Sequence, residues 1–295
     1  MTEARSAAKP IRLTEPTDLL GECPIWRRGE DALYWIDVRG KALQRLSLAD
    51  GGRRRWSLPE MIGSWAISGA GRALVALETE IARLDLAAGS LERVAAPHLG
   101  LSDMRFNDGR CDPRGRFWVG SMNDRTREPV GGLYRLGGAG CERVLDGVAV
   151  PNSLCWSPDG RAMYFSDGRE PVISVFDYDP ATGAPSNRRE FARLEAGAGV
   201  PDGATVDRTG CLWCAIYGTG ALHRYAPDGA LIERIELPIS QPTHCAFGGP
   251  DYATMFVTTA RQRLAPETLA LQPAAGSVLA LDVGARGAPE PDFAH

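Results

Sequence analysis

The chain has 295 residues, of which 33 are basic and 37 are acidic, and its formal net charge at pH 7 is −4. This balance offers no attraction to nucleic acid or to an anionic membrane surface, so we expect neither as a partner. No stretch approaches the ~18 apolar residues of a membrane span, the first residues lack the apolar core of a signal peptide, and seven cysteines form no regular framework, which together favour a cytoplasmic protein with reduced thiols.

A short polar turn that contains glycine, followed at once by an apolar run, recurs six times along the chain. The apolar runs are residues 32–36, 73–77, 117–119, 162–165, 211–214 and 255–257. Their turns carry Gly29, Gly71, Gly115, Gly160, Gly210 and Gly249, so that successive turns are 39 to 50 residues apart. This spacing is typical of the four-stranded blades of a β-propeller.

Each apolar run is followed by a second alternating segment, which we interpret as the next strand of the same blade. These segments are residues 42–48, 81–86, 132–136, 172–178, 221–225 and 277–283. Six such repeats fill the chain, so we predict an all-β fold, a single six-bladed β-propeller domain over residues 1–295. Residues 1–10 and 286–295 are expected to be flexible tails. Two β-sandwiches are the alternative, and the single continuous period argues against them.

A propeller ring closes best when its last blade takes a strand from the other end of the chain. Ile11, Arg12 and Leu13 precede the first full repeat, so we predict that they complete the last blade. Closure of the ring would also remove an exposed sheet edge.

Conspicuous polar residues begin the strand that leads to each turn glycine. They lie at two fixed distances before that glycine, seven residues for Glu22, Ser64 and Asp108 and eight for Asn107, Asn152 and Asp202. A β-bulge or a longer turn would reconcile the two distances. Because the innermost strands of all blades begin around one end of the central channel, we expect the oxygen atoms of these side chains to converge on its axis.

Convergent oxygen ligands without clustered histidine or cysteine predict a site for a hard cation. Calcium, magnesium and manganese suit such ligands best. The types of the ligand residues alone do not exclude zinc or iron(II). The alternative is that Asp and Asn beside Gly or Pro, as in residues 201–203, are ordinary turn residues. Their shared position in the repeat favours the cation site.

From about residue 15 to residue 285, the sequence resembles the regucalcin and gluconolactonase family, also called the senescence marker protein and gluconolactonase-like family. The resemblance rests on a series of segments in order, residues 20–26, 105–109, 150–154, 176–179, 186–189, 200–203, 247–249 and 258–261. It implies a six-bladed propeller with one divalent cation, which is calcium, zinc, manganese or iron(II) in different members, held by Glu22, Asn152 and Asp202. It also implies that Arg105 and Asn107 bind the ring oxygens and hydroxyls of the substrate.

The predicted function is the metal-dependent hydrolysis of a sugar-acid lactone, an aldonolactone, to the free aldonic acid in sugar catabolism. In this hypothesis the cation polarises the lactone carbonyl or activates a water molecule. Asp202, which the resemblance implies as general base, takes a proton from that water or serves only as a ligand. Residues 121–125, where some animal members carry a second acidic residue, are expected to form a loop over the pocket. We expect a monomer or a weak homo-oligomer.

Two other functions stay open on the same scaffold. A metal-dependent phosphotriesterase would be favoured by a pocket rich in apolar groups rather than hydroxyl-binding groups. A calcium-binding propeller without catalysis would bind the cation and turn over no lactone. Other catalytic devices are absent from the sequence, which contains neither a GxSxG elbow nor an HExxH motif.

Several neighbouring residues have a structural interpretation. Cys23 and the CxxC of Cys211 and Cys214 are expected to be buried thiols, because successive strand positions alternate between faces. His244 is interpreted as a hydrogen-bonded residue of an innermost strand. The side chain of Ser64 is a candidate to reach the pocket. Trp65, Tyr217 and Trp26 are candidates to face a sugar ring, with core packing favoured for Trp26.

Overall fold

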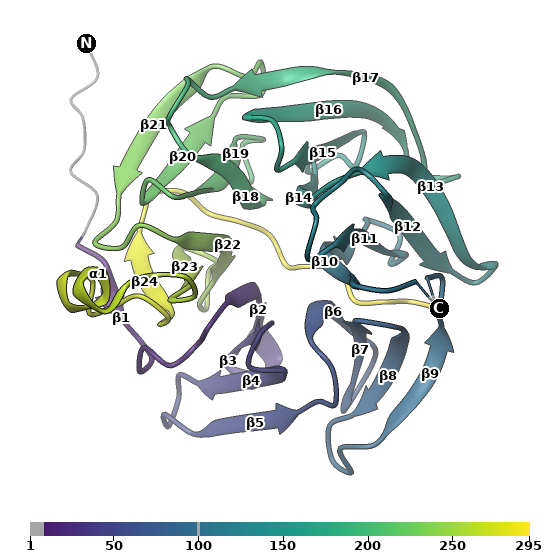
Figure 1. The fold of residues 1–295 in the computed structure, drawn as a ribbon, viewed down its shortest axis with the longest axis horizontal. Helices are drawn as coiled ribbons and strands as arrows, with labels where there is room; N and C mark the ends of the chain where they lie inside the picture. The colour runs from purple at the N-terminus through teal and green to yellow at the C-terminus, as the bar shows by residue number, and fades with distance from the viewer. Residues whose placement is uncertain (1–8, 99–100) are drawn as a thin grey trace.

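The computed structural model describes residues 9–98 and 101–295. Their strands form six four-stranded antiparallel sheets arranged in a ring around a central axis (Figure 1). The predicted six-bladed β-propeller is therefore confirmed. Residues 1–8, which belong to the first expected tail, lie outside the described residues.

In every blade the chain begins at an innermost strand beside the central axis and proceeds outward. The first five blades are β2 (Gly21–Arg27), β3 (Ala32–Asp37), β4 (Ala42–Ser47) and β5 (Arg53–Ser57); β6 (Ile62–Ile67), β7 (Arg72–Leu77), β8 (Ile81–Asp85) and β9 (Leu91–Ala95); β10 (Met104–Cys111), β11 (Phe117–Asn123), β12 (Gly131–Gly137) and β13 (Gly140–Val148); β14 (Pro151–Trp156), β15 (Ala162–Asp167), β16 (Val172–Asp179) and β17 (Ala184–Arg193); and β18 (Val200–Val206), β19 (Leu212–Tyr217), β20 (Ala221–Tyr225) and β21 (Leu231–Glu236).

The sixth blade joins the two ends of the chain. It contains β22 (Pro242–Gly248), β23 (Thr254–Thr259) and β24 (Leu279–Asp282), with the short helix α1 (Pro266–Leu271) between the last two. The strand β1 (Ile11–Arg12) completes this sheet, because Ile11 pairs with Ala280 and Arg12 with Leu279. The predicted closure of the ring by an N-terminal strand is thus confirmed.

The core lies between neighbouring blades. The six apolar runs of the sequence form the second strand of each blade, and strands such as β3 are buried along their whole length because another blade covers each face. Trp65, Trp118 and Trp213 are fully buried between blades, where replacing one of them with alanine would cost about 3–5 kcal/mol. Trp65 also donates from Nε1 to the Cys23 carbonyl oxygen at 2.8 Å, so it is a core residue rather than a pocket residue.

Bulges interrupt the innermost strands near their first residues. The pairing register shifts after Glu22, Asn107 and Asn152, and the following residues Cys23, Asp108 and Ser153 have φ of 47°, 44° and 58°. A bulge of this kind redirects a side chain and is frequent beside functional sites.

The bulges, and not the turn glycines, align the blades, because Glu22, Asn107 and Asn152 each come directly before the residue of positive φ. The first turn is a 3₁₀ helix, Arg28–Glu30, whose left-handed position is taken by Asp31 at φ 45° instead of a glycine. Gly29 is therefore not equivalent to the glycines of the other turns, and counting from it misaligns the first blade. Glu22 corresponds to Asn107, and not to Asp108.

The segment after β24 is not the flexible tail that we expected from residues 286–295. It crosses the middle of the ring to the opposite blades, as the yellow trace in Figure 1 shows. Backbone hydrogen bonds hold it along the way, from Gly287 to Tyr252 at 2.9 Å and from Phe293 to Ile67 at 2.7 Å. The buried ring of Phe293 packs against residues of the second and third blades, which explains why this segment stays on the propeller.

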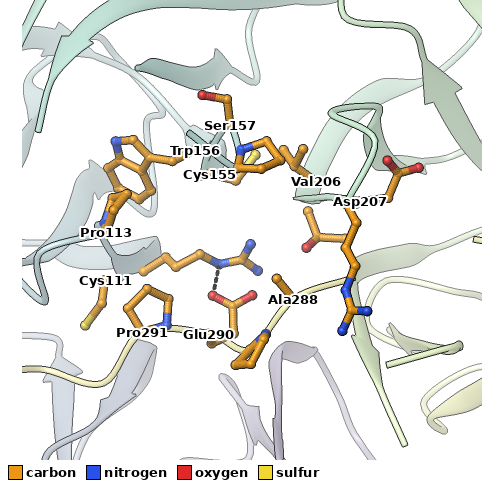
Figure 2. A pocket seen from close by; sticks show the side chains of 15 residues that line it. Cys111, Pro113, Cys155, Trp156, Ser157, Val206, Asp207, Ala288, Glu290 and Pro291 are labelled. Carbon is orange, nitrogen blue, oxygen red and sulfur yellow. Dashed lines mark ion pairs between the residues drawn. The ribbon is translucent and has the colours of Figure 1, made fainter. Parts of the chain in front are cut away.

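Glu290 of the crossing segment reaches into the channel, at the end opposite the first residues of the innermost strands (Figure 2). Its Oε2 lies 3.3 Å from Nε of Arg110, and the two side chains are only 16% and 9% exposed. Nη2 of the same arginine lies 3.0 Å from Nε2 of His244 on β22. The crossing segment thus neutralises a buried arginine that belongs to the innermost strand β10.

Acid should weaken the fold partly through His223, a buried residue of β20. Burial lowers its pKa from 6.5 to about 4, and Nδ1 has the Tyr225 hydroxyl at 3.0 Å. Between these pH values the unfolded chain binds a proton that the folded protein does not, so stability falls as the pH decreases through this window. We expect the urea unfolding midpoint of His223→Gln to fall less between pH 7 and pH 4.5 than that of the parent. The exposed His295→Gln is the control, and an equal pH dependence of parent and His223→Gln would contradict the assignment.

All seven cysteines are free thiols, and six of them are buried. The interpretation of Cys23, Cys211 and Cys214 as buried thiols is confirmed. Among the described residues, no helix combines the length and the apolar character needed to cross a membrane.

Candidate active site

All five residues implied by the resemblance line one pocket, at the end of the channel where the innermost strands begin. Glu22 comes from β2, Arg105 and Asn107 from β10, Asn152 from β14 and Asp202 from β18. Each of these side chains is buried. Residues up to 180 positions apart in the sequence therefore meet, because each stands near the first residue of its blade's innermost strand.

Asn107 connects the arginine to the second asparagine. Its Oδ1 accepts a hydrogen bond from Arg105 Nη1 at 2.7 Å. Its Nδ2 donates to Asn152 Oδ1 at 2.9 Å and to the Pro151 carbonyl oxygen at 2.8 Å. These contacts fix the orientation of the Asn152 amide, whose oxygen keeps a lone pair for a further partner.

Asp124 holds Arg105 in place from the loop after β11. Its Oδ1 accepts from Arg105 Nε at 2.7 Å, and its Oδ2 lies 2.6 Å from Nη1 of Arg39. Partial burial would raise the pKa of Asp124, but the two arginines outweigh burial and hold the pKa at about 2. Residues 121–123 of the expected covering loop belong instead to β11, and Asp124, which follows them, contributes a carboxylate that holds Arg105 and that we did not predict.

Glu22 and Asp202 are buried carboxylates with little compensation from the protein. Burial raises the pKa of Glu22 to about 8, and burial together with the charge of Glu22 raises the pKa of Asp202 well above 3.8. The carboxylate of Glu22 accepts a backbone hydrogen bond from Cys23 at 3.3 Å, while that of Asp202 accepts none from the described residues. Two such groups in one pocket favour an added positive charge.

The donor set fits a divalent cation. Glu22 and Asp202 offer carboxylate oxygens and Asn152 offers an amide oxygen in the same pocket. Oxygen donors of these types are those that hard cations prefer. The raised pKa values of the two carboxylates give the physical reason, since a cation would favour the ionised form of both.

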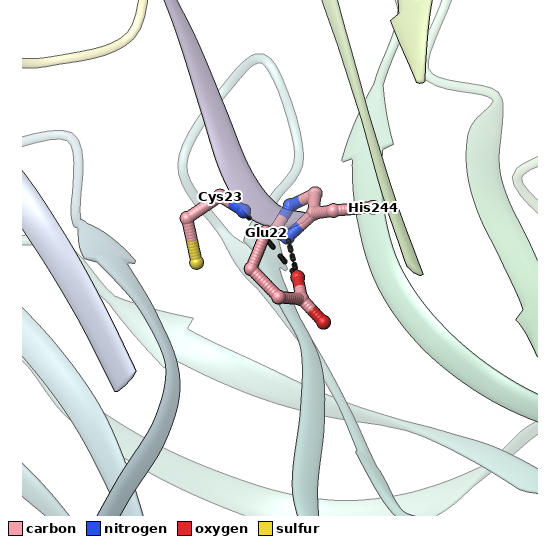
Figure 3. A group of neighbouring side chains, drawn as sticks. All are labelled: Glu22, Cys23 and His244. Atoms are coloured by element: carbon pink, nitrogen blue, oxygen red, sulfur yellow. Dashed lines mark hydrogen bonds and ion pairs between the residues drawn. The ribbon is translucent and has the colours of Figure 1, made fainter. Parts of the chain in front are cut away.

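A second group of possible ligands, Glu22, Cys23 and His244, fits a metal less well (Figure 3). His244 Nδ1 lies 3.4 Å from Glu22 Oε2. The sulfur of Cys23 points away from that carboxylate, toward the Gly63 carbonyl oxygen and the Ser64 hydroxyl, each at 3.9 Å. Burial and the nearby charge of Glu22 raise the pKa of this thiol well above 9, so it stays protonated and is a poor ligand.

The structure also corrects or completes four other expectations. Ser64 does not reach the pocket, because it is fully buried and donates to the Gly109 carbonyl oxygen at 2.8 Å. Asp108 turns away from the pocket and accepts from the Leu154 amide at 2.9 Å. His244 is the hydrogen-bonded innermost-strand residue that we expected, through its contact with Arg110. Of the three candidate aromatic residues, Tyr217 lines the pocket, and Trp26 stacks on Phe256 in the core.

The mouth of the pocket is basic and was not predicted. Arg127 and Arg263 line it together with Gln262 and Tyr217. Neither guanidinium group forms an ion pair or a hydrogen bond with any described residue. The two arginines come from loops between strands, where the blade period carries no information on side-chain position.

The family assignment follows from the match of residues 20–261 to the model of the SMP-30/Gluconolactonase/LRE-like region. The chain belongs to the SMP-30/gluconolactonase-like family. The match includes all five pocket residues named above and extends from the first innermost strand to the end of β23.

Named members of the SMP-30/gluconolactonase-like family resemble the chain over almost its whole length. A 6-deoxy-6-sulfogluconolactonase of Pseudomonas putida is 39% identical, covering 94% of this chain and 95% of the relative. An L-arabinolactonase of Azospirillum brasilense is 38% identical, covering 94% and 93%. By their names, both relatives are lactonases, that is, hydrolases of an ester bond.

A solved structure gives the same fold. It is that of a calcium-binding protein, regucalcin, from Agrobacterium tumefaciens, which is 31% identical to this chain. The two superpose with a TM-score of 0.94 over 98% of each chain. The blade arrangement found here is therefore that of the SMP-30/gluconolactonase-like family.

Proposed function

We propose that the protein is a metal-dependent lactonase that hydrolyses an aldonolactone to the free aldonic acid. The observation that carries this proposal is the pair of buried carboxylates, Glu22 and Asp202, which have no Arg or Lys ion-pair partner among the described residues and face a pocket shared with Arg105. The names of the two bacterial lactonases support the same reaction type.

Glu22, Asn152 and Asp202 would hold one divalent cation through their oxygen atoms. When bound, such a cation acts as a Lewis acid on the lactone carbonyl or lowers the pKa of a water molecule. Asn107 orients the amide of Asn152 through the hydrogen bond of 2.9 Å. With both amide protons of Asn107 already donated, we assign this residue a positioning role more than direct contact with the sugar.

Arg105 would stabilise negative charge on the reacting lactone. Its Nε and Nη1 are held by Asp124 and Asn107, whereas Nη2 donates no hydrogen bond to a described residue. That nitrogen is free to donate to the carbonyl oxygen as it becomes negative, or to a ring hydroxyl. Because two contacts hold the guanidinium in advance, little reorganisation is needed during the reaction.

Asp202 would act as general base. Its carboxylate accepts no hydrogen bond from the described residues, so an oxygen that the cation does not use is available to accept a proton. It takes a proton from a water molecule that attacks the carbonyl carbon. The bond from that carbon to the ring oxygen then breaks, and the ring oxygen receives the proton, leaving a hydroxyl group and a carboxylic acid that ionises.

The composition of the pocket favours a sugar over an organophosphate. Nine of its thirteen lining residues have polar or charged side chains, with Leu20, Val150 and Val200 among the others. A phosphotriesterase would instead be favoured by an apolar pocket. Hydroxyl groups of a sugar find donors and acceptors around the whole wall.

The test is acid release from five- and six-carbon aldonolactones by chelator-treated protein, with single divalent cations added back. Spontaneous lactone opening is subtracted with a protein-free sample. We expect loss of turnover after chelation and recovery with at least one of calcium, zinc, manganese or iron(II). Folded, cation-loaded protein that opens no lactone would overturn the proposal, and a non-catalytic cation-binding propeller would then be favoured.

A further inference from the structure

Two arginines stand at the mouth of the pocket on opposite sides of the ring. Arg127 belongs to the loop that links β11 to β12 in the third blade, and Arg263 follows β23 in the sixth. In a ring of six, these blades face each other across the channel (Figure 1). Both loops lie at the end where the innermost strands begin, so the two side chains approach one pocket from two sides.

Tyr217 lines the same pocket as the two arginines. Burial raises the pKa of this phenol, and the positive charges of Arg263 and Arg127 oppose the rise. The two arginines therefore stand beside Tyr217 in the lining of one pocket.

These two arginines differ from the others nearby in having no acidic partner. Arg39 and Arg105 share Asp124, and Arg125 pairs with Asp103 at 2.9 Å. For Arg127 and Arg263, no carboxylate of the described residues lies within ion-pair distance. Each neighbouring arginine thus contacts a carboxylate, whereas these two contact none among the described residues.

The balance of charges in the pocket leaves the two guanidinium groups with positive charge that a ligand could neutralise. A divalent cation would balance Glu22 and Asp202, and Asp124 is opposite Arg105. Arg127 and Arg263 then remain as uncompensated positive charges at the mouth. A neutral sugar needs hydroxyl partners, which the wall already supplies, whereas a guanidinium group is suited to an oxyanion.

We propose that the preferred substrate is an anionic lactone, an aldonolactone with a carboxylate, sulfonate or phosphate on a carbon remote from the reacting carbonyl, bound by Arg127 and Arg263. This inference rests on the proposed lactonase function. The lactone end reaches the buried carboxylates, while the anionic end stays at the mouth between the two loops. The arginines determine specificity and also increase the rate of encounter with an anion.

The test compares matched lactones with the same ring, one neutral and three that carry a carboxylate, a sulfonate or a phosphate at the far end. For the parent protein we expect kcat/KM to be higher with at least one anionic lactone, and to fall with rising salt for that lactone alone. Arg127→Gln and Arg263→Gln should each lose about 10- to 100-fold in kcat/KM on that lactone, mainly through KM, since each removes a charge-assisted contact. The neutral lactone should change by less than about threefold. The anionic lactone with the highest kcat/KM identifies the group.

Arg125→Gln is the matched control, because Arg125 lies in the same loop, is exposed and is paired with Asp103. It should leave both kinds of substrate unchanged. Equal losses on neutral and anionic lactones in Arg127→Gln and Arg263→Gln, or a parent protein that prefers the neutral lactone, would overturn the anionic assignment while the lactonase function stands. Failure to open any lactone of either charge would instead refute the proposed function itself.

Discussion

Asp202→Asn should lower kcat for lactone hydrolysis by about a hundred- to ten-thousand-fold, the range for loss of a general base. The amide is nearly the same size as the carboxylate and keeps one oxygen for a cation, but it cannot accept a proton from water. The loss should appear in kcat with the cation bound. Measurement of kcat at saturating cation, together with direct titration of cation binding, separates the two roles of this residue.

The stability of the Asp202→Asn variant provides the control against simple unfolding. Burial and the charge of Glu22 both disfavour ionised Asp202, so removing its charge should leave the cation-free protein as stable as the parent, or more stable. Asp228→Asn, an exposed residue in a turn of the same blade, should change neither kcat nor stability. A cation-loaded Asp202→Asn with kcat within about tenfold of the parent would remove the base assignment and leave only a ligand role.

Glu290→Ala should destabilise the folded protein by about 3–5 kcal/mol, because it leaves the buried guanidinium of Arg110 without its carboxylate. For a chain of this size, that corresponds to a decrease of roughly 10 °C in the unfolding midpoint. The measurement is urea or thermal unfolding of purified protein. The matched control is Glu267→Ala in the helix α1, an exposed glutamate, for which we expect a change below about 0.5 kcal/mol.

A second variant separates the stability contributed by the ion pair from the stability contributed by the other contacts of the crossing segment. Changing both partners, Arg110→Met with Glu290→Met, removes the two charges together and should recover much of the stability lost in Glu290→Ala. A Glu290→Ala protein within about 1 kcal/mol of the parent would show that the pair contributes little, and that Phe293 and the backbone hydrogen bonds alone hold the segment.

The fold could be predicted because its signal is local and repeated. Each turn with its apolar run indicates one blade. In the structure, the six runs lie in the second strands of the six sheets. Ring closure by Ile11 and Arg12 followed from the same period. The crossing segment could not be recognised in this way, since residues 286–295 are rich in Ala, Gly and Pro and resemble a free tail. Its contacts with Arg110, Ile67 and Tyr252 depend on the finished ring.

The site could be predicted in part, for a related reason. Glu22, Asn107, Asn152 and Asp202 hold matching positions in the repeat, which the sequence reveals. Asp124 became part of the site through the pairing of β10 with β11, which aligns Met104 with Asn123, and the strand register was not known in advance. Arg127 and Arg263 lie in loops of unrelated length, so only the folded ring brings them to one mouth.

Ring closure by β1 has a consequence for how this protein reaches its native state. The partner of Ile11 is Ala280, in the last strand of the last blade, so during synthesis the first segment must wait until nearly the whole chain has left the ribosome. From the time β24 has formed until β1 pairs with it, β24 presents an unpaired edge, the kind of surface that recruits strands from other chains. Two paired residues thus cover the edge of the last blade, and removal of residues 9–13 should leave β24 exposed and produce dimers paired edge to edge, or aggregates, in place of monomeric rings.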